Sequence, residues 1–569
     1  MSKTSHLESE DSVQLASIFE ERAEHLSREE LDRWTAYSER DEEIIGKLMG
    51  PGAKLLIGPR GSGKSTLLRT AYFRHLRERQ VLAAYVNYAK SLSIEPLFHK
   101  QANALQVFRQ WVVMKVVLSV ATAIKEMGLA VPESLSKIVP KAKKFVRTLE
   151  TSSTPELPER PIAPSELVEL LEEWADELEL SRVVLLMDDA AHVFSLEQQR
   201  EFFEVFRELR SRRVSGKAAV YPGITSYSPN FHVGNEAERV EAWYRTEDPE
   251  YLPRMRDIVA RRLPDELKKR LVGREEIVDY LALAAFGLPR GFLNMLSQLL
   301  EVGENSAVNP TRQRADQAIA EYAESVRGIF RALKGKLPRF RHFVETGAKL
   351  DLAMVAALRR FNAIDGSRES KATVIGLREP IGGELERMLN MLEYAGVVRK
   401  ISAVSRGVKG RFERYSIHYA IIIADTALGL GKSYSSAAVV AALSERDAHA
   451  FVRTDGDNLL GVNFQKECTL DLPPCKKCGT IRVSDEQRFC MKCGNELANA
   501  SVYEELLRRP IDELPLTAKK IEGIKAHTDI RTIQDVILDD EVQQLRTVPY
   551  IGKFWATRIR IYAEEFVSV

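Results

Sequence analysis

The chain has 569 residues, which is enough for about four domains of ordinary size. Hydrophobic residues make up 44% of it, charged residues make up 29%, and the formal net charge is only +1. This balance excludes a polycation that would attract nucleic acid through its overall field. Any nucleic-acid contact must therefore come from local basic patches.

Membrane and secretory features are not expected from the sequence. The most apolar stretch, residues 111–123, contains Lys115, which predicts a buried helix rather than a membrane span. Residues 1–10 are polar and acidic, unlike a signal peptide. Four of the five cysteines are clustered, which indicates a metal site in a reducing compartment rather than a disulfide framework. We expect a cytoplasmic protein with no membrane contact, and association with the nucleoid stays open.

A complete phosphate-binding loop, G-x-x-x-x-G-K-[ST], lies at residues 58–65. The expected nucleotide-binding residues are the loop and the residue after it, namely Gly58, Pro59, Arg60, Gly61, Ser62, Gly63, Lys64, Ser65 and Thr66. An apolar run at 53–57 predicts the strand before the loop, and residues 66–72 predict the helix after it. The glycines let backbone N–H groups converge on a β-phosphate at the positive end of the helix dipole. Lys64 is expected to reach the β- and γ-phosphates, and Ser65 to coordinate Mg²⁺.

A second apolar run, residues 183–189, ends in two acids. A continuous apolar run is expected of a strand that is buried on both faces in a parallel sheet. Asp188 is placed to hold Mg²⁺ through a bound water, and Asp189 to polarise the water that attacks the nucleotide. A buried strand that merely ends in an acidic turn is the alternative, and it becomes improbable downstream of a complete phosphate loop.

Further elements complete an α/β pattern. Residues 81–87 and 217–226 predict two more strands, and the second is expected to carry Thr225 or Ser226 toward the γ-phosphate, although either could be a turn residue. Residues 286–296 predict a helix with Arg290 in its first turn, placed either to reach the phosphates from a helical lid or to lie in solvent. Alternating strands and helices predict a doubly wound parallel sheet with ligands at the carboxyl ends of its strands.

The order of these elements resembles AAA+ ATPases of the origin-recognition and replication-initiator type. The matching segments, which span roughly residues 35–310, are 38–43, 58–65, 85–87, 188–192 and 287–290. The resemblance implies ATP and Mg²⁺ as cofactors, and hydrolysis coupled to conformational change or to assembly as a homo-oligomer. It also implies that Arg290 is a sensor-2 arginine, that Thr225 or Ser226 sits at sensor 1, and that the segment around Arg40 packs near the adenine base.

The sequence departs from that family's pattern in two places. Asp189 stands where an initiator usually has Glu, and its shorter side chain would favour slow, switch-like hydrolysis. An Asp-Asp pair is also common in STAND-type signalling ATPases. A trans-acting arginine finger is not identified, and the candidates in the right interval are Arg239, Arg245, Arg254 and Arg256.

The region after the lid predicts a winged helix. Residues 384–395 form an amphipathic pattern, residues 397–401 and 412–417 predict two strands, and the turn between them is basic. This resembles the domain that initiator ATPases carry after their lid. Arg406, Lys409 and Arg411 are its candidate phosphate contacts, while a purely structural domain is the alternative.

Two C-x-x-C-G knuckles follow, with Cys475, Cys478, Cys490 and Cys493 as their thiols. Four thiolates at this spacing form a closed tetrahedral Zn²⁺ site of the structural kind, a zinc ribbon. Cys468 is expected to be a bystander. The lysines of the ribbon, Lys476, Lys477 and Lys492, could meet nucleic acid or a protein partner.

The last seventy residues are predicted to be helical. Residues 511–517 and 533–537 resemble the C-terminal domain of the bacterial RNA polymerase α subunit, and residues 545–559 resemble a helix-hairpin-helix. In that motif, residues 549–552 would offer backbone N–H groups to one DNA phosphate without reading sequence. Lys553, Arg558 and Arg560 flank the hairpin, but acids slightly outnumber bases overall, so protein contacts stay open.

The predicted organisation has six parts. They are an N-terminal helical segment (1–34), an AAA+ core (35–245) with a helical insertion at about 101–181, a helical lid (246–330), a winged-helix-containing domain (331–460), a zinc ribbon (461–499) and a helix-hairpin-helix domain (500–569).

The leading hypothesis is an ATPase that binds DNA through its C-terminal modules. No nuclease, protease or transferase pattern occurs, so an effector partner would supply such chemistry in DNA maintenance or defence. The alternative is a STAND-type signalling ATPase whose ribbon and helical hairpins recognise proteins.

Overall fold

The structure is a computed structural model. It describes residues 26–94, 103–150, 160–190, 196–300, 309–364, 371–431, 434–444, 450–482, 489–497, 502–514, 518–549 and 551–567, together with residues 19, 23, 157, 158, 487 and 516. Most of the predicted N-terminal segment 1–34, residues 191 and 192 of the acidic motif and much of the predicted loop 152–164 lie outside the described residues.

A five-stranded parallel sheet organises the N-terminal half, in the order β2-β3-β4-β1-β5. Its strands are β1 (Lys54–Ile57), β2 (Leu82–Asn87), β3 (Val183–Asp188), β4 (Val214–Val220) and β5 (Glu238–Glu241). Because all five run in the same direction, their carboxyl ends open at one edge, where α/β proteins bind ligands. The α/β fold with a parallel sheet is therefore confirmed.

Burial explains why the central strands were visible in the sequence. Every residue of β3 and of β4 is buried, as expected of strands covered on both faces. The predicted strands at 53–57, 81–87 and 183–189 are confirmed to within one residue at each end. The strand predicted at 217–226 is wrong at its carboxyl end, because β4 stops at Val220 before a turn that contains Pro222 and Gly223.

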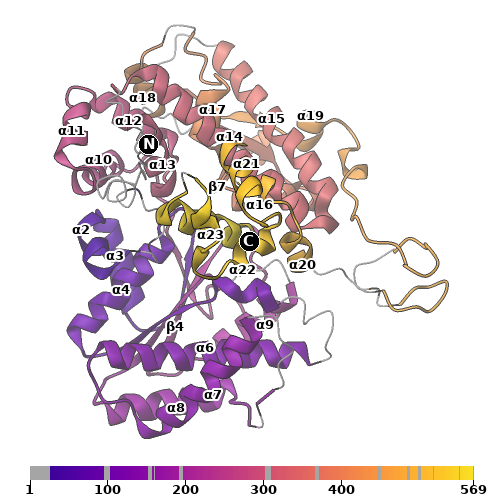
Figure 1. The fold of residues 1–569 in the computed structure, drawn as a ribbon. Helices are drawn as coiled ribbons and strands as arrows, with labels where there is room; N and C mark the ends of the chain where they lie inside the picture. The colour runs from indigo at the N-terminus through magenta and orange to yellow at the C-terminus, as the bar shows by residue number, and fades with distance from the viewer. Residues whose placement is uncertain are drawn as a thin grey trace, which may run out of the picture.

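Helices flank this sheet, and some of them pack directly on its strands. They are α2 (Arg28–Trp34), α3 (Glu39–Met49), α4 (Lys64–Glu78), α6 (Ala104–Glu126), α7 (Glu133–Glu150), α8 (Pro164–Glu177) and α9 (Leu196–Glu208). The insertion predicted at 101–181 supplies α6, α7 and α8, which lie at one end of the molecule in Figure 1. Helix α6 has the length and composition of a membrane span, but 72% of that window is buried inside the fold. The prediction of a buried helix is confirmed.

A second group of helices lies at the other end of the molecule in Figure 1. They are α10 (Tyr251–Arg262), α11 (Asp265–Leu271), α12 (Glu275–Ala284), α13 (Pro289–Leu300), α14 (Arg312–Lys336), α15 (Arg341–Ile364), α16 (Gly383–Tyr394), α17 (Tyr419–Ala424), α18 (Ser436–Ser444) and α19 (Gly456–Leu460). The boundary expected between residues 330 and 331 falls inside α14, so one continuous helix joins the proposed lid to the next segment.

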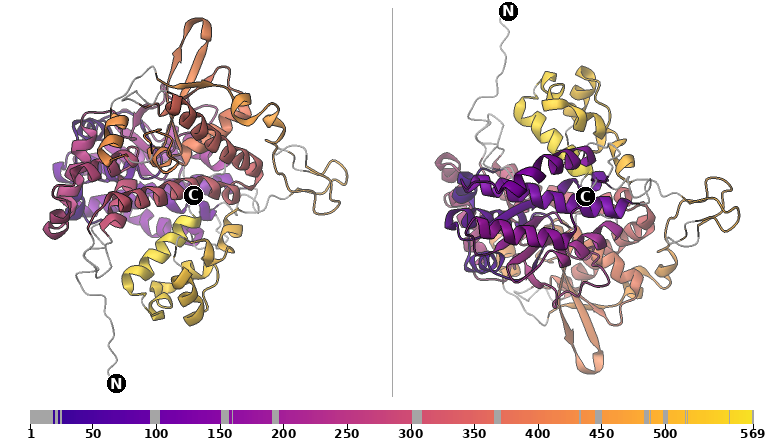
Figure 2. Two further views of the ribbon diagram at one scale, coloured as in Figure 1. Left: turned by 90° about the horizontal axis from the view of Figure 1, so that it is seen from above. Right: turned by 90° about the horizontal axis from the view of Figure 1, so that it is seen from below.

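A smaller sheet follows α15 in the chain, in the order β7-β8-β6-β9. Its strands are β6 (Val374–Arg378), β7 (Val398–Ser405), β8 (Arg411–Ile417) and β9 (Val452–Thr454). Strands β7 and β8 form an antiparallel hairpin, which projects from the body in both views of Figure 2. The predicted helix and the two predicted strands of the winged-helix pattern are thus present, while the winged-helix assignment itself remains a proposal.

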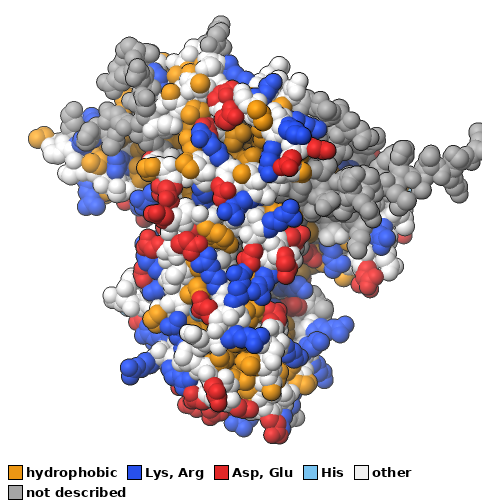
Figure 3. Space-filling view, turned by 90° about the vertical axis from the view of Figure 1, so that its left-hand side faces the viewer, with side chains coloured by type: hydrophobic (Ala, Val, Ile, Leu, Met, Phe, Trp, Pro, Cys, Tyr) orange, Lys and Arg blue, Asp and Glu red, His pale blue; other side chains and the backbone are white. Residues whose placement is uncertain are grey.

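The C-terminal segment is helical, with α20 (Val502–Leu507), α21 (Ala518–His527), α22 (Ile533–Leu538) and α23 (Lys553–Val567). Helix α20 packs against α14, and the segment carrying the four cysteines projects from the body before it (Figure 1). Basic and acidic side chains are interspersed over the face shown in Figure 3, in keeping with the small net charge. The surface on that side carries no field of one sign.

Candidate nucleotide site and accessory sites

The phosphate-binding loop joins the end of β1 to the start of α4, as the motif predicts. Gly61 and Gly63 have φ values of +80° and +93°, a region that residues with a Cβ rarely adopt. At Gly58 an added Cβ would lie only 2.4 Å from the Ser62 Oγ. The Ser62 hydroxyl itself is buried without a hydrogen-bond partner. The loop is therefore a tight backbone cradle with a buried polar group, which fits a bound phosphate.

Lys64 is folded over this loop. Its Nζ donates to the Gly58 carbonyl at 2.6 Å and to the Pro59 carbonyl at 3.1 Å, which leaves one hydrogen for a phosphate oxygen. The ammonium also lies 3.9 Å from the centroid of the Tyr221 ring. Burial lowers the pKa of Lys64 to about 7, opposed by the carboxylates of Asp189 and Asp188.

The two acids lie at the carboxyl end of β3. Asp188 is 1% exposed and accepts hydrogen bonds from the Tyr85 hydroxyl at 2.6 Å and from the Asp189 N–H at 3.0 Å. Asp189 adopts a φ of +50°, and its Oδ1 accepts a hydrogen bond from the Tyr221 hydroxyl at 3.0 Å. Both carboxylates act electrostatically on Lys64, so the phosphate loop and the acidic pair meet at one site.

Arg290 lies against the same loop. It is in the first turn of α13, and its backbone N–H donates to the Gly61 carbonyl at 3.4 Å. A Cβ added at Gly61 would lie 2.8 Å from the Arg290 Cβ. Helix α13 therefore meets the phosphate loop at Arg290, which favours the nucleotide-contact interpretation over a solvated arginine.

Thr225 and Ser226 both form hydrogen bonds within the fold. The Thr225 hydroxyl donates to the Tyr221 carbonyl at 2.7 Å and accepts from the Tyr221 N–H at 3.2 Å. The Ser226 N–H donates to the Gln199 Oε1 at 2.6 Å. These bonds favour the turn interpretation of both residues. The first residue after β4 is Tyr221, which the sequence reasoning missed because it extended the strand to residue 226.

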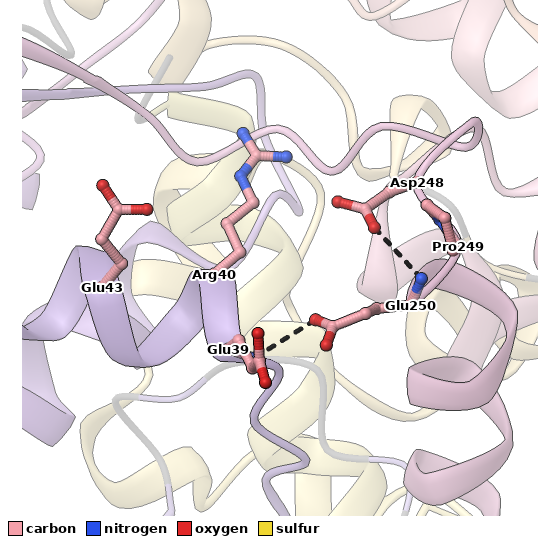
Figure 4. A pocket seen from close by; sticks show the side chains of 6 residues that line it. All are labelled: Glu39, Arg40, Glu43, Asp248, Pro249 and Glu250. Atoms are coloured by element: carbon pink, nitrogen blue, oxygen red, sulfur yellow. Dashed lines mark hydrogen bonds between the residues drawn. The ribbon is translucent and has the colours of Figure 1, made fainter.

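Arg40 lies beside the entrance of the phosphate loop. Its Nη2 donates to the Glu241 carbonyl at 3.0 Å, and Glu241 is paired with Ile57, the last residue of β1. Arg40 also lines an open cavity of about 670 Å³ between α3 and α10, shown in Figure 4. The other lining residues are Glu39, Glu43, Asp248, Pro249 and Glu250. This position fits the predicted place of a nucleotide base.

A buried network of hydrogen bonds joins α3 to α10. Asp41, fully buried in α3, accepts a hydrogen bond from the Arg254 Nε at 2.8 Å and another from the Tyr244 hydroxyl. Arg254 is thus held within the chain and does not suit a trans-acting finger. Of the other candidates, Arg245 pairs with Glu241 and Arg256 with Asp279, while Arg239 is exposed on the edge strand β5.

The four cysteines of the two knuckles converge, with all their Sγ atoms within 4.8 Å of one another. The Sγ distances are 3.6 Å for Cys475–Cys493 and 3.5 Å for Cys478–Cys490. A tetrahedral Zn²⁺ with Zn–S bonds of about 2.3 Å requires sulfur separations of about 3.8 Å. The two knuckles also share one turn geometry, since Gly479 and Gly494 have φ values of +68° and +66°. The cluster therefore fits a zinc ion.

A cluster of arginines gathers on the small sheet, around Phe451 and Phe412. The guanidinium-to-ring distances are 5.4 Å for Arg406, 6.0 Å for Arg414 and 5.2 Å for Arg453, all to Phe451, and 6.0 Å for Arg378 to Phe412. Burial, followed by the charge of Arg406, lowers the pKa of Arg414. Of the predicted contacts only Arg406 belongs to this cluster, since Arg411 pairs with Glu379 and the Lys409 side chain lies outside the described residues.

The predicted helix-hairpin-helix is described in part. Helix α23 begins at Lys553 directly after Gly552, as expected, but Tyr550 and the Lys553 side chain lie outside the described residues. The arginines that flank the hairpin donate hydrogen bonds within the domain. The Arg558 Nε donates to the Tyr562 hydroxyl at 2.8 Å, and the Arg560 Nη1 donates to the Asp539 carbonyl at 3.2 Å. This weakens the case for phosphate contacts here.

No family model matches the sequence, and no curated protein matches it. Among solved structures, the chain is similar to Cdc6p from Pyrobaculum aerophilum at 14% identity and a TM-score of 0.30, over 73% of this chain and 97% of that one. It is also similar to the Aeropyrum pernix Orc1 protein in complex with DNA at 16% identity and a TM-score of 0.29, over 70% and 94% of the two chains. At these values the likeness carries no residue role to this chain.

Zinc should be present at one equivalent per chain and should support folding of the ribbon. Replacing Cys478 by Ser removes one of four thiolates, so zinc content should fall toward zero while ATP turnover stays near the wild-type rate. Elemental analysis measures the zinc. The matched control is Cys468→Ser, because this buried cysteine lies outside the cluster. Zinc-free wild-type protein, purified without chelator, would show that the cluster is not a zinc site.

ATP affinity should fall as the pH rises from 7 to 9. Burial lowers the pKa of Lys64 to about 7, so above that pH the amine is neutral and binding of the anionic phosphates must take up about one proton. Affinity should drop by up to about tenfold per pH unit. Titration calorimetry in buffers of different ionisation enthalpy measures the proton uptake.

The matched control for this titration is Lys217→Met. Lys217 is another buried lysine whose pKa burial lowers to about 7, but it lies on β4 opposite Lys54, at the amino end of β1 and away from the phosphate loop. Proton uptake should persist in this variant. Binding of ATP at pH 8.5 with no proton uptake would contradict the assignment of Lys64.

Proposed function

We propose that the chain is an initiator-like AAA+ ATPase that binds and hydrolyses ATP and binds DNA through its C-terminal modules. The observation that carries the ATPase part is the meeting of Lys64, the Asp188–Asp189 pair and Arg290 at the carboxyl edge of a parallel sheet. These groups come from three segments more than a hundred residues apart in the sequence. Their convergence on one phosphate loop supports a nucleotide-hydrolysis site.

Each residue has a role in this proposal. The backbone of the loop and Lys64 hold the β- and γ-phosphates, and Arg290 contacts the phosphates from the lid. Ser65 and Asp188 offer the oxygen ligands that Mg²⁺ prefers, and the bound ion neutralises phosphate charge. Asp189 accepts a hydrogen bond from the attacking water and orients it. Thr225 is not assigned a catalytic role, because its hydroxyl is bonded to the backbone of its own turn.

The cavity beside Arg40 is the proposed base site. Carboxylates of Glu39, Asp248 and Glu250 line it, and such groups can accept a hydrogen bond from the amino group of adenine. The Glu39 N–H already donates to Glu250 at 3.2 Å, which draws the ends of α3 and α10 together as Figure 4 shows. The proposed place of the adenine base is therefore this cavity.

DNA binding is proposed at the small sheet first and at the C-terminal hairpin second. Burial and the charge of Arg406 together lower the pKa of Arg414, and a phosphate backbone offsets such repulsion between arginines. The projecting β7–β8 hairpin presents Arg406 and Arg414 of this cluster. Assembly into a homo-oligomer would use Arg239 as the candidate finger. Recruitment of an effector partner in DNA maintenance or defence is part of the proposal, with the zinc ribbon as its candidate contact.

The alternative, a STAND-type signalling ATPase, makes a different prediction about DNA. In that case the ribbon and the C-terminal helices bind proteins, so duplex DNA leaves ATP turnover unchanged. The crowding of Arg378, Arg406, Arg414 and Arg453 favours the DNA-binding interpretation. ATPase assays with and without DNA separate the two.

ATP turnover should depend on Lys64 and Asp189 in different ways. Lys64→Ala should abolish ATP binding, because it removes the cation that meets the phosphates. Asp189→Asn should bind ATP but lose at least about 100-fold in turnover, because an amide cannot accept the proton of the attacking water. Filter binding and phosphate release measure the two steps. The control is Asp176→Asn, an exposed acid on α8 that should keep the wild-type rate. A wild-type rate in Asp189→Asn would rule out its assigned role.

DNA affinity should fall when the arginine cluster is neutralised. Arg406→Gln combined with Arg453→Gln should weaken binding several-fold for all sequences alike. The salt dependence should become shallower by about 0.9 in log–log slope for each DNA phosphate that the variant no longer neutralises. Fluorescence anisotropy at several salt concentrations measures both quantities. The control is Arg261→Gln, an exposed arginine on α10 that pairs with Asp257.

The C-terminal hairpin is tested in the same titration. Truncation after Asn499, or Gly552→Val, should weaken binding if backbone N–H groups near Gly552 approach a phosphate closely. Unchanged affinity in these variants, together with weaker binding by the arginine variant, would assign DNA binding to the small sheet alone. If the wild type does not bind DNA even at low salt, the signalling alternative stands.

A further inference from the structure

Helix α16, from the segment after the lid, packs directly on the nucleotide site. Its last residue, Tyr394, contacts Tyr221 edge to face, with the ring centroids 5.7 Å apart, and both rings are buried. The turn after β4 also touches the backbone of α16. Gly223 has a φ of +77°, and a Cβ there would lie 2.2 Å from the Asn390 carbonyl oxygen. The end of β4 and α16 are therefore in tight contact.

Tyr221 lies between the two groups that matter most for hydrolysis. Its hydroxyl donates to Asp189 at 3.0 Å, and its ring lies 3.9 Å from the Lys64 ammonium. Burial, with the nearby Asp189 carboxylate, raises the pKa of Tyr221 well above its usual value. The hydroxyl consequently stays protonated and remains a donor at every pH at which the protein works.

This hydrogen bond matters because of the shape of Asp189. An aspartate is one methylene shorter than the glutamate usual at such a position, and its carboxylate can rotate between several orientations. With Oδ1 held by Tyr221, Oδ2 is left as the acceptor for the attacking water. Tyr394 in turn fixes the Tyr221 ring, since it packs against it on the side of α16.

A second contact anchors α16 and the strand that follows it, β7, on the other side of the strand that carries the phosphate loop. Arg399 of β7, which follows α16 closely in the chain, is 7% exposed. Its guanidinium donates to the Tyr244 carbonyl at 2.8 Å and to the Glu241 Oε1 at 2.6 Å. Glu241 is on β5, on one side of β1, and Tyr221 follows β4, on the other. The α16–β7 unit is thus anchored on both sides of the strand that carries the loop.

We propose that Tyr221 is a positioning residue for Asp189 and that Tyr394 holds Tyr221 in place, so that ATP turnover depends on the docking of α16. This inference rests on the proposed ATPase function. It makes Tyr394 and the docked face of α16 part of the hydrolysis machinery. A ligand that moves the α16–β7 unit changes the rate of hydrolysis with little effect on ATP binding, because the phosphate loop itself stays in place.

The test separates turnover from binding. Tyr221→Phe keeps the ring under Lys64 but removes the donor to Asp189, so kcat should fall about tenfold while the ATP Kd stays within about twofold. Tyr394→Ala should lower kcat in the same way, and Tyr394→Phe, which retains the ring, should recover most of that loss. Gly223→Ala, which displaces α16 without changing a tyrosine, should also lower kcat. The double variant Tyr221→Phe/Tyr394→Ala should be no slower than Tyr221→Phe, since both act through one carboxylate.

The matched control is Tyr415→Phe. Tyr415 is equally buried, and its hydroxyl donates to the Glu413 carboxylate at 2.8 Å, but it lies in the small sheet away from the loop. Its variant should keep the wild-type kcat, and thermal unfolding checks the folding of every variant. A wild-type kcat in folded Tyr221→Phe, or losses that multiply in the double variant, would overturn the inference and leave the ATPase proposal standing. A wild-type protein that binds ATP without any turnover would overturn both.

Discussion

The ammonium group of Lys64 is buried at the carboxyl edge of the parallel sheet, and much of the site is arranged around it. Burying a charge is costly unless polar partners replace water. Here two loop carbonyls accept its hydrogens, the Tyr221 ring faces it, and the Asp188 and Asp189 carboxylates lie within electrostatic reach. The tight loop, with its glycines in the left-handed region, is what brings the carbonyls to the lysine. The same backbone turns its N–H groups toward a bound phosphate.

Parallel strands make this arrangement possible, because they bring distant segments to one edge. The loop follows β1, the acids follow β3 and Tyr221 follows β4, and β4 lies between the other two strands. Arg290 arrives from the lid, and Tyr394 from α16. Residues spread over more than three hundred positions therefore meet within one site. A displacement of α16 can therefore reach the acid pair through two direct contacts, from Tyr394 to Tyr221 and from Tyr221 to Asp189.

The sequence predicted the parts of the site whose signals are local. Glycine spacing identified the loop, apolar runs identified β1, β2 and β3, and C-x-x-C spacing identified the cluster of four cysteines. The end of β4 was missed although Pro222-Gly223 marks a turn, because the hydroxyl residues beyond it suggested a longer strand. Strand β5 was missed because this short edge strand has three charged residues out of four and no apolar run. Tyr221, Tyr394 and Arg399 were missed as site residues because their roles come from contacts between elements that no sequence period reveals.

The arginine cluster and the tyrosine pair belong to one structural unit. Helix α16 ends at Tyr394 and β7 begins at Val398, so the strand that leads into the projecting hairpin starts within four residues of the contact with Tyr221. DNA phosphates held by Arg406 and Arg414 would act on the same unit that positions Asp189. Coupling of this kind is reciprocal for binding equilibria. Because docking of α16 acts on turnover rather than on ATP affinity, DNA bound to this unit is expected to change kcat, while ATP and DNA leave each other's Kd nearly unchanged. The switch-like hydrolysis expected from the short Asp189 side chain would then be fast or slow according to whether the α16–β7 unit is docked, which places the rate under the control of a DNA-bound hairpin.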